Sequence, residues 1–440
     1  MTPQTNTIPT ILKKIGIKAL NPMQINTIEA YATTENIVLL SSTGTGKTLA
    51  FLLSIMPELQ HISGQTQVLI IAPSRELATQ IEKVFKSLGL PNKITSCYGG
   101  HKRETEENNL VEAPAVIVGT PGRLADHIRR GNIKTDTIKT IIIDEFDKLL
   151  EQNFIEEMSF IIKELKNVNK RLLTSATHLD SYPDFLKFSQ PKIFNYLTGE
   201  KSEALALQYI QCADKDKLEE AYRLLCMLGG RPTILFCNHR ESVERVSDFL
   251  NTKGIPNQFY HGAMEQHERD SALCKFRNGT VFFLVTTDLA SRGLDIAHIR
   301  NIIHYHLPPN LETFIHRNGR TARMDASGTA IVMLSPDEKM PHFISNIDSE
   351  ITLPEVAVSP DKPKWTTLFI AAGKKDKINK IDIVGFFTNK GQLRKEDIGL
   401  IEVKDFAAFV AVKKFGANQL LQSIKDQKLK GKKIKIAVAK

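Results

Sequence analysis

The sequence predicts an α/β protein with two successive domains built on parallel sheets, followed by a small α+β domain. In the first half, short continuous apolar runs alternate with helix-like segments, and the same alternation starts again after residue 206. A different order, β-α-β-β-α-β, follows a proline-punctuated stretch. Alternation of this kind is typical of parallel sheets that helices cover on both faces. A chain of 440 residues also fits about three domains at roughly 150 residues each.

The first domain is expected over residues 1–205 and contains five apolar runs of strand length. A polar, helix-like segment, residues 75–89, follows the second of them. Runs of four to eight apolar residues bounded by turn residues predict buried strands. The five expected strands cover 36–42, 67–74, 115–120, 140–146 and 171–177.

The second domain is expected over residues 206–350 and repeats this pattern. Its expected strands cover 232–238, 257–261, 280–288, 301–308 and 328–334, and its expected helices lie near 240–253, 265–277 and 311–322. Residues 351–364 contain Pro354, Pro360 and Pro363 among polar residues and predict a linker.

The third domain is expected over residues 365–440. Strands are expected at 367–373, 397–405, 406–414 and 432–440, with helices at 380–391 and 417–427. This order is the topology of an RRM-like fold.

The positive charge of the chain is concentrated at one end. Of its 58 Lys and Arg residues, 19 lie in residues 361–440, beside only 8 of the 49 Asp and Glu residues. The first 360 residues are therefore slightly acidic. A basic block attracts polyanions, so nucleic acid is one interpretation. A solvated lysine surface or contact with anionic lipid stays open from charge alone.

Several classes of protein are excluded by composition. The five cysteines form no C-x-x-C pair, so neither a zinc site nor a disulfide framework is predicted. The first ten residues lack a basic and an apolar region, so they do not resemble a signal peptide. No apolar run reaches the ~18 residues of a membrane span. We expect a cytoplasmic protein without membrane contact.

A glycine-rich turn, SSTGTGKT at residues 41–48, joins the first expected strand to a helix-like segment. This context is that of a P-loop, in which backbone N–H groups at a helix N-terminus surround phosphate oxygens. Lys47 would neutralise phosphate charge, and the Thr48 hydroxyl would ligate Mg²⁺. A tight turn without nucleotide is the alternative for such a loop in isolation.

Two carboxylates, Asp144 and Glu145, follow the apolar run that starts at residue 140. Ligands of open α/β sheets bind at the carboxyl ends of the strands. Asp144 would reach Mg²⁺ through water, and Glu145 would orient and deprotonate an attacking water. An isolated acidic pair would be read as a helix start, but the P-loop upstream favours the catalytic interpretation.

Three arginines, Arg317, Arg320 and Arg323, lie close together in HRNGRTAR at residues 316–323. Arginines in a second domain can stabilise the charge of a γ-phosphate when two domains close. A salt-bridged helix end is the alternative.

Taken together, these segments resemble the DEAD-box RNA helicase family over residues 15–345. Gln24 matches the glutamine motif, 41–48 the P-loop motif, and DEFD at 144–147 the motif that names the family. Further matches, in the order of the family, are PSRELA (73–78), Gly99–Gly100, TPGR (120–123), SAT (175–177), LFCN (235–238), Gln266 with Arg269, TTDLASRGLD (286–295) and HRNGRTAR. Eleven motifs in the right order make a chance match very unusual.

The resemblance implies two tandem RecA-like P-loop domains and a role for each matched residue. ATP and Mg²⁺ are the implied cofactors. Gln24 would read adenine, Asp295 would lie near the ribose, and Ser42, Thr43, Gly44, Thr45, Gly46, Lys47 and Thr48 would hold the phosphates. Lys47, Asp144, Glu145, Arg320 and Arg323 would be catalytic. Ser175, Thr177, Asp147 and His316 would couple the ATP site to domain closure. Arg75, Gly100, Thr120, Arg123, Arg269, Thr287 and Arg317 would contact RNA.

The sequence departs from the family pattern in four places. Phe146 replaces the usual alanine of DEAD, Ala322 replaces a glycine, and Ser41 replaces a small residue. No aromatic residue precedes Gln24. Both catalytic carboxylates remain, so hydrolysis is still expected.

The third domain resembles the RNA-binding domain of a bacterial DEAD-box subfamily that acts in large-ribosomal-subunit assembly. The resemblance implies ribosomal RNA or a pre-ribosomal particle as partner. Lys374, Lys375, Lys432 and Lys433 are candidate RNA contacts. Phe406 and Phe409 could be core residues or base-stacking residues. The function expected is RNA-stimulated ATP hydrolysis that unwinds or remodels structured RNA. A DNA helicase, an ATP-gated RNA clamp and a generic RNA chaperone are the alternatives, and no obligate protein partner is indicated.

Overall fold

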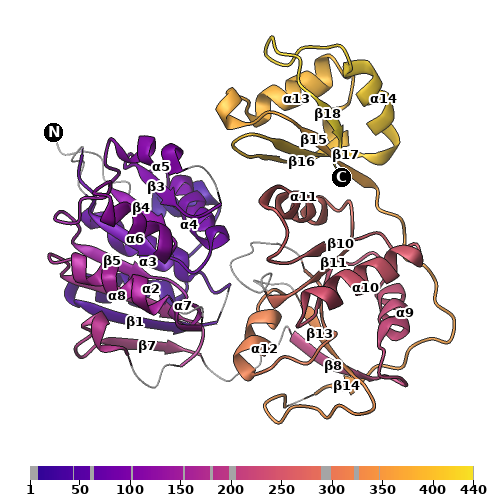
Figure 1. Ribbon diagram of the computed structural model, residues 1–440, viewed down its shortest axis with the longest axis horizontal. Coiled ribbons are helices and arrows are strands. Elements are labelled where there is room, and N and C mark those ends of the chain that lie inside the picture. Colours follow the sequence, from indigo (N-terminus) through magenta and orange to yellow (C-terminus); the bar gives the residue numbers. More distant parts are fainter. Residues whose placement is uncertain are drawn as a thin grey trace. The chain divides into compact units, whose positions relative to one another are not determined.

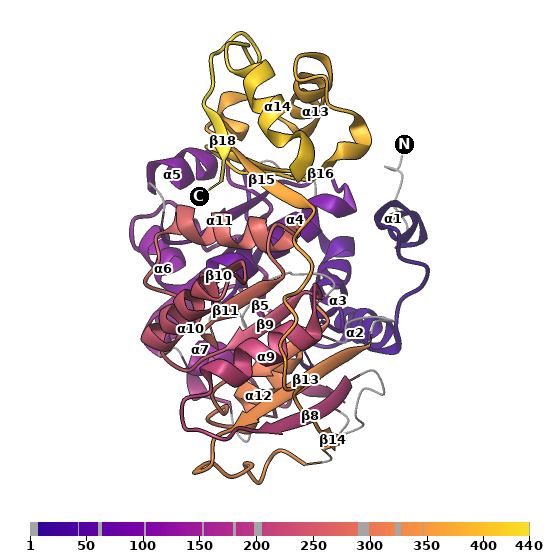
Figure 2. The ribbon, with the colours of Figure 1, turned by 90° about the vertical axis from the view of Figure 1, so that its right-hand side faces the viewer.

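A computed structural model (Figures 1 and 2) describes most of the chain. The described residues are 8–42, 44–59, 64–100, 103–151, 154–178, 182–197, 205–288, 299–321, 327–345 and 347–439. They form two compact units. The first contains one sheet and the second contains two, and each unit is treated by itself below. Among the described residues, no helix combines the length and the apolar character that crossing a membrane requires.

The first unit is built on a seven-stranded parallel sheet in the order β3-β4-β2-β5-β6-β1-β7. In the central register, Ile70 of β2 pairs with Ile142 of β5, which pairs with Leu172 of β6. The strands are β1 (Asn36–Ser41), β2 (Val68–Ile71), β3 (Ile94–Cys97), β4 (Val116–Gly119), β5 (Thr140–Ile143), β6 (Lys170–Ser175) and β7 (Lys192–Tyr196).

Helices cover both faces of this sheet because neighbouring strand residues point to opposite sides. Ile70 and Ile142 belong to one core, with residues of α1 to α4, whereas Ile71 and Ile143 belong to the other, with residues of α6 to α8. The helices are α1 (Ile8–Ile15), α2 (Pro22–Thr33), α3 (Lys47–Ile55), α4 (Arg75–Leu88), α5 (Arg103–Leu110), α6 (Pro121–Arg129), α7 (Phe146–Glu151) and α8 (Ile155–Glu164).

The second unit begins with another seven-stranded parallel sheet, in the order β10-β11-β9-β12-β13-β8-β14. Counted from β8, this is the strand order of the first sheet. The strands are β8 (Leu205–Gln211), β9 (Thr233–Phe236), β10 (Asn257–Tyr260), β11 (Phe283–Thr286), β12 (Asn301–His304), β13 (Gly328–Leu334) and β14 (Ser349–Glu350). The helices are α9 (Leu218–Leu228), α10 (Arg240–Thr252), α11 (Gln266–Arg277) and α12 (Leu311–Asn318).

The third sheet is antiparallel, in the order β16-β17-β15-β18, as expected for an RRM-like fold. Its elements are β15 (Trp365–Ile370), α13 (Lys380–Asn389), β16 (Ile398–Val403), β17 (Ala408–Lys413), α14 (Lys414–Ile424) and β18 (Ile436–Val438). Both views place α13 and α14 on one face of the sheet and α11 against the other (Figures 1 and 2). The predicted fold class is confirmed.

Sequence patterns missed the strands that lack a continuous apolar run. β3 reads ITSC, and β7 is an edge strand whose Lys192 and Ile193 are exposed. β8 and β14 were also missed. β5 ends at Ile143, earlier than expected, because Glu145 has a φ of 51° and α7 begins at Phe146. A residue with positive φ cannot continue a strand.

Candidate nucleotide site and nucleic-acid interface

The P-loop lies at the carboxyl end of β1, and α3 begins at its lysine. Gly44 and Gly46 have φ values of 83° and 93°, a left-handed conformation that glycine adopts without a steric cost. Lys47 is buried, and its Nζ donates to the carbonyl oxygens of Ser41 and, at 2.9 Å, Ser42. The lysine is therefore held beneath the loop that the sequence predicts to surround phosphate. Thr43 is outside the described residues.

Gln24 lies beside the same loop, in the first turn of α2. Its Oε1 accepts from the Asn21 backbone N–H at 3.0 Å, and the Asn21 side chain caps the helix in return. The Gln24 Nε2 donates to the carbonyl oxygen of Gly46 at 3.3 Å, and a Cβ at Gly46 would lie 2.5 Å from this nitrogen. The glutamine motif therefore contacts the P-loop directly, which explains why residue 46 is glycine.

The two carboxylates follow β5 and share a threonine. The Thr174 hydroxyl donates to Asp144 Oδ1, and the Glu145 backbone N–H donates to the Thr174 oxygen at 3.1 Å. Burial raises the pKa of the Asp144 carboxyl, while the Thr174 hydrogen bond and the Lys47 charge oppose this rise. Glu145 has a φ of 51°, a strained conformation for a residue with a side chain. Backbone strain of this kind persists only where the surrounding structure holds it, and it is common at functional sites.

Oxygen ligands suited to Mg²⁺ are present here. Asp144 offers a buried carboxylate that the charge of Lys47 reaches, and Thr48 follows that lysine in the first turn of α3. Mg²⁺ prefers carboxylate, hydroxyl and water oxygens, so these residues fit it.

Asp147 links the DEAD and SAT segments. Its Oδ2 accepts from the Ala176 backbone N–H at 3.1 Å and from the Thr177 hydroxyl at 3.2 Å. The Ser175 hydroxyl donates to the Thr177 carbonyl at 2.7 Å. Phe146, which replaces the usual alanine, is fully buried in the core beneath α7 and α8. The apolar core therefore accommodates the larger side chain at this position.

The expected RNA contacts of the first unit follow three neighbouring strands, β2, β3 and β4. Arg75 begins α4, and its guanidinium lies 4.8 Å from the centre of the Tyr98 ring. Gly100 has a φ of 94°, and a Cβ there would lie 3.2 Å from Arg75 Nη1. Thr120 and Arg123 flank the start of α6. The three motifs therefore share one edge of the sheet.

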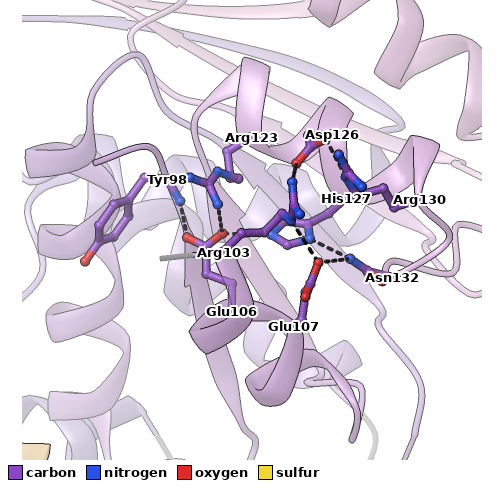
Figure 3. A network of polar contacts seen from close by, with 9 residues as sticks. All are labelled: Tyr98, Arg103, Glu106, Glu107, Arg123, Asp126, His127, Arg130 and Asn132. Atoms are coloured by element: carbon purple, nitrogen blue, oxygen red, sulfur yellow. Dashed lines mark hydrogen bonds and ion pairs between the residues drawn. The ribbon is translucent and has the colours of Figure 1, made fainter. Parts of the chain in front are cut away.

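Glu106, a buried carboxylate that no sequence motif marks, connects these motifs. Glu106 of α5 accepts from Arg123 and from the Tyr98 backbone, and it faces His127 (Figure 3). No motif marks this residue, because α5 reads RETEENNL and predicts a solvated helix.

In the second unit, Arg269 and Thr287 are accessible and Arg317 is not. Arg269 donates to Gln266 in the first turn of α11, and half-buried Thr287 follows β11. Arg317 is fully buried. Its guanidinium donates two hydrogen bonds to the Asp288 carboxylate, one to the Asn238 side-chain oxygen and one to the His306 carbonyl. The burial of Arg317 gives the predicted RNA contact no support in this structure, and that contact stays a prediction. Arg317 is a structural link within the domain.

The structure describes some of the remaining predicted residues of the second unit and not others. His316 and Arg320 are buried at the end of α12 and beyond it. Asp295, Ala322 and Arg323 lie outside the described residues.

One face of the antiparallel sheet is covered by α11. Phe369 and Phe409 have ring centres 5.6 Å apart and pack against Cys274. At the same interface, the Asn278 amide donates to the Thr367 hydroxyl at 3.1 Å. Phe409 is therefore a core residue, whereas Phe406 is 68 % exposed.

Charged pairs surround this apolar contact. Arg277 lies 3.2 Å from Glu402, and Lys404 lies 3.6 Å from Asp270 of α11 and 3.3 Å from Glu402. Although burial raises it, the charges of Arg277 and Lys404 bring the pKa of Glu402 to about 2. The predicted lysines are exposed: Lys374 and Lys375 lie in the turn after β15, and Lys432 and Lys433 lie before β18.

Comparisons with known proteins agree with this geometry. Residues 21–184 match the DEAD/DEAH box helicase family, 216–325 the helicase conserved C-terminal domain, and 367–438 the DbpA RNA binding domain. The ATP-dependent RNA helicase DbpA of Escherichia coli is 31% identical over 98% of this chain and 97% of that protein. The DbpA of Bacillus subtilis is 29% identical over 97% of this chain and 96% of that protein.

Solved structures show the same fold in the helicase core. Saccharomyces cerevisiae Dbp5 bound to RNA and ADP BeF3 matches with a TM-score of 0.67 and 25% identity, over 74% of this chain and 86% of that chain. Mss116p bound to ssRNA and AMP-PNP matches with a TM-score of 0.66 and 26% identity, over 74% and 72% of the two chains. With a P-loop, its DEFD carboxylates and a DbpA-type module in one chain, the protein belongs to the DEAD-box ATP-dependent RNA helicases and is similar to DbpA over nearly its full length.

Proposed function

We propose that this ATP-dependent RNA helicase remodels large-subunit ribosomal RNA during ribosome assembly. The observation that carries the proposal is the likeness to DbpA through the RNA-binding module, residues 367–438, where the basic excess of the chain lies. DEAD-box cores hold RNA through its backbone, which gives affinity without sequence choice. Choice of target therefore falls to the module. A cytoplasmic location stays a prediction.

ATP hydrolysis uses the residues at the carboxyl ends of β1 and β5. Lys47 neutralises charge on the phosphates that the P-loop backbone, from Ser42 to Thr48, surrounds. Glu145, fixed by its backbone conformation, orients the attacking water and takes its proton. Thr48, and Asp144 through water, would hold Mg²⁺, which would polarise the phosphate oxygens. Gln24 reads the adenine edge next to Gly46.

The second helicase domain supplies the remaining groups when the two domains close. Arg320 and Arg323 stabilise negative charge on the γ-phosphate, and Asp295 contacts the ribose. Ser175, Thr177 and Asp147 transmit the state of the ATP site, because one carboxylate of the DEAD segment holds the SAT backbone. His316 is proposed to take part in this coupling.

The RNA backbone is held by Arg75, Gly100, Thr120 and Arg123 in the first domain and by Arg269 and Thr287 in the second. Arg75 Nη1 and Arg269 Nε are buried donors with no hydrogen-bond partner within the described part of the chain. A buried donor without a partner is costly, and a phosphate oxygen would satisfy it. This supports a phosphate contact at both arginines.

The module binds its RNA away from the face that α11 covers. Two loops carry the exposed lysines, Lys374 and Lys375 on one and Lys432 and Lys433 on the other. An ion pair connects the loops, since Lys432 Nζ lies 3.5 Å from Asp376 Oδ1. Such a pair of basic loops suits the backbone of a structured hairpin better than a single strand laid across a sheet.

The test is RNA-stimulated ATP hydrolysis by the full chain with four additions: none, duplex DNA, bulk RNA and a fragment of large-subunit ribosomal RNA. We expect the ribosomal fragment to stimulate at concentrations at least tenfold below those of bulk RNA. Replacing Lys374 and Lys375 by Ala should remove this preference and keep stimulation by bulk RNA. Equal stimulation by bulk RNA in the unmodified protein would favour a generic RNA chaperone, and hydrolysis without strand separation would favour an ATP-gated clamp.

A further inference from the structure

Glu106 is a buried carboxylate on a helix that otherwise faces water. Only Glu106 and Leu110 of α5 are buried, and the Glu106 side chain is 1 % exposed. Burying a carboxylate is costly unless it is paired and hydrogen-bonded. The position is therefore explained by what the carboxylate contacts.

Both oxygens of this carboxylate are used, and they reach two different motifs (Figure 3). Oε1 accepts from the Tyr98 backbone N–H at 2.8 Å, directly before Gly99 and Gly100. Oε2 accepts from Arg123 Nη1 at 3.1 Å, in the TPGR segment. One side chain thus fixes the distance between the glycine pair and the TPGR arginine.

A third motif is joined through Tyr98. The Tyr98 ring lies under the Arg75 guanidinium, and Gly100 leaves room for that guanidinium. Because the backbone of Tyr98 is held by Glu106, the position of its ring beneath Arg75 depends on the same carboxylate.

His127 supports Glu106 from behind, in a defined tautomer. The Asn132 amide nitrogen donates to His127 Nδ1 at 3.0 Å, so the proton of the neutral ring lies on Nε2. Nε2 therefore donates to Glu106 Oε2, 2.7 Å away. This hydrogen bond fixes the carboxylate plane and keeps one lone pair directed toward Arg123.

A metal centre is the competing explanation, since Cys97, Glu106 and His127 bring ligand atoms within 4.8 Å of one another. Three observations oppose it. Arg123 already places a positive charge on the carboxylate, and both ring nitrogens of His127 have hydrogen-bond partners. Burial raises the pKa of the Cys97 thiol, whereas a metal ligand must be a thiolate.

We propose that Glu106 is a positioning residue for RNA: it holds Arg123 and the segment from Tyr98 to Gly100 in the one arrangement that fits an RNA backbone. The proposal rests on the proposed RNA contacts of Arg75, Gly100 and Arg123. An arginine that is oriented in advance loses less side-chain entropy on binding. The effect of Glu106 should therefore appear in RNA affinity and not in the chemistry of ATP.

The experiment titrates RNA into the ATPase assay with the full-length protein and its Glu106→Ala, Glu106→Gln, Arg123→Ala and Glu107→Gln variants. Glu107 is the matched control, because it is next in α5 and bonds Arg103 and Asn132 at the surface. We expect Glu106→Ala to raise the KM for RNA about tenfold, which corresponds to about 1.4 kcal/mol. The kcat at saturating RNA and the KM for ATP should stay within about twofold.

The amide variant keeps the shape and removes the charge, so Glu106→Gln should raise the KM for RNA about threefold. Glu107→Gln should leave it unchanged. In the Arg123→Ala background, Glu106→Gln should have a smaller effect than alone, because one route of its action is then missing.

The outcomes separate the two levels of proposal. If Arg123→Ala leaves the KM for RNA unchanged, the proposed RNA contact itself is wrong. If Arg123→Ala raises it and both Glu106 variants do not, the positioning role is wrong. If the Glu106 variants lower kcat and thermal stability with an unchanged KM for RNA, Glu106 is a structural residue only. Glu106→Gln decides the matter if Glu106→Ala does not fold.

Discussion

The two parallel sheets have the same strand order, but different kinds of residue follow the carboxyl ends of their matching strands. In the first, β1 ends in the P-loop and β5 in Asp144 and Glu145. In the second, the matching strands β8 and β12 end near Lys217 and His306. The comparison teaches that nucleotide chemistry depends on the loops after the strands and not on the fold.

At the matching place in the second sheet, the cationic side chains already have carboxylate partners. Buried Lys217 donates to the Met333 carbonyl at 3.0 Å and lies 2.8 Å from Glu338. A cavity of about 310 Å³ lies beside it, and its Arg245 pairs with Asp216 at 2.7 Å. Cations that already have carboxylate partners offer little to a phosphate. We therefore expect a single nucleotide site in the described residues, at the first sheet.

Replacing the two lysines tests this contrast and should give the largest effect. Lys47→Ala should lower the kcat of RNA-stimulated ATP hydrolysis by about 10²–10³-fold, because one preorganised positive group is lost from the phosphates. Lys217→Ala should leave kcat within about threefold and lower the free energy of unfolding by about 1–3 kcal/mol, since Glu338 loses its partner. Loss of hydrolysis in Lys217→Ala would contradict the comparison.

Arginines of the two domains should also behave differently. Arg317→Ala should lower the free energy of urea unfolding by about 2–4 kcal/mol, below the cost for a fully buried pair because Asp288 is partly exposed. Arg75→Ala removes a contact with the Tyr98 ring and should cost under about 1 kcal/mol. It should instead raise the KM for RNA about five- to tenfold. Urea titration and RNA titration measure the two quantities, and a reversed pattern would overturn the assignment of Arg317.

These contrasts also mark how far sequence reasoning reached. Lys47, Asp144 and Arg75 could be predicted because a local motif fixes their places at strand ends. The burial of Arg317 could not be predicted, since its partners Asn238 and Asp288 lie after β9 and β11, in segments distant in sequence.

The same holds for contacts between elements that no local pattern links. Glu106 lies in a helix whose sequence predicts a solvated face, and only the Arg123 and Tyr98 contacts explain its burial. Phe409 and Phe406 look alike in sequence, but α11 covers one and leaves the other exposed. The periodicity of a strand tells which side a residue faces and not what covers that side.

A buried histidine gives the sheets a further difference. His304, the last residue of β12, pairs in register with Phe236 of β9. Ile143, the last residue of β5, pairs in the same way with Ile71 of β2. Burial lowers the pKa of His304 to about 3, with the nearby Arg317 charge acting in the same direction. His306 follows the same trend, with burial as the main cause of a pKa of about 4.

The second unit should therefore lose stability in mild acid. An unfolded histidine has a pKa of about 6.5, so below that pH the unfolded state binds a proton that folded His304 does not. The stability that comes from keeping His304 neutral is fully present above about pH 6.5 and is lost as the pH falls toward 3. From pH 7 to pH 5 this histidine alone should cost about 2 kcal/mol. Urea unfolding at both pH values measures it, and His304→Gln should remove most of that part of the slope. If His304→Gln loses as much free energy of unfolding between pH 7 and pH 5 as the unmodified protein, the acid sensitivity arises elsewhere. If the first unit loses more than the second, the comparison is reversed.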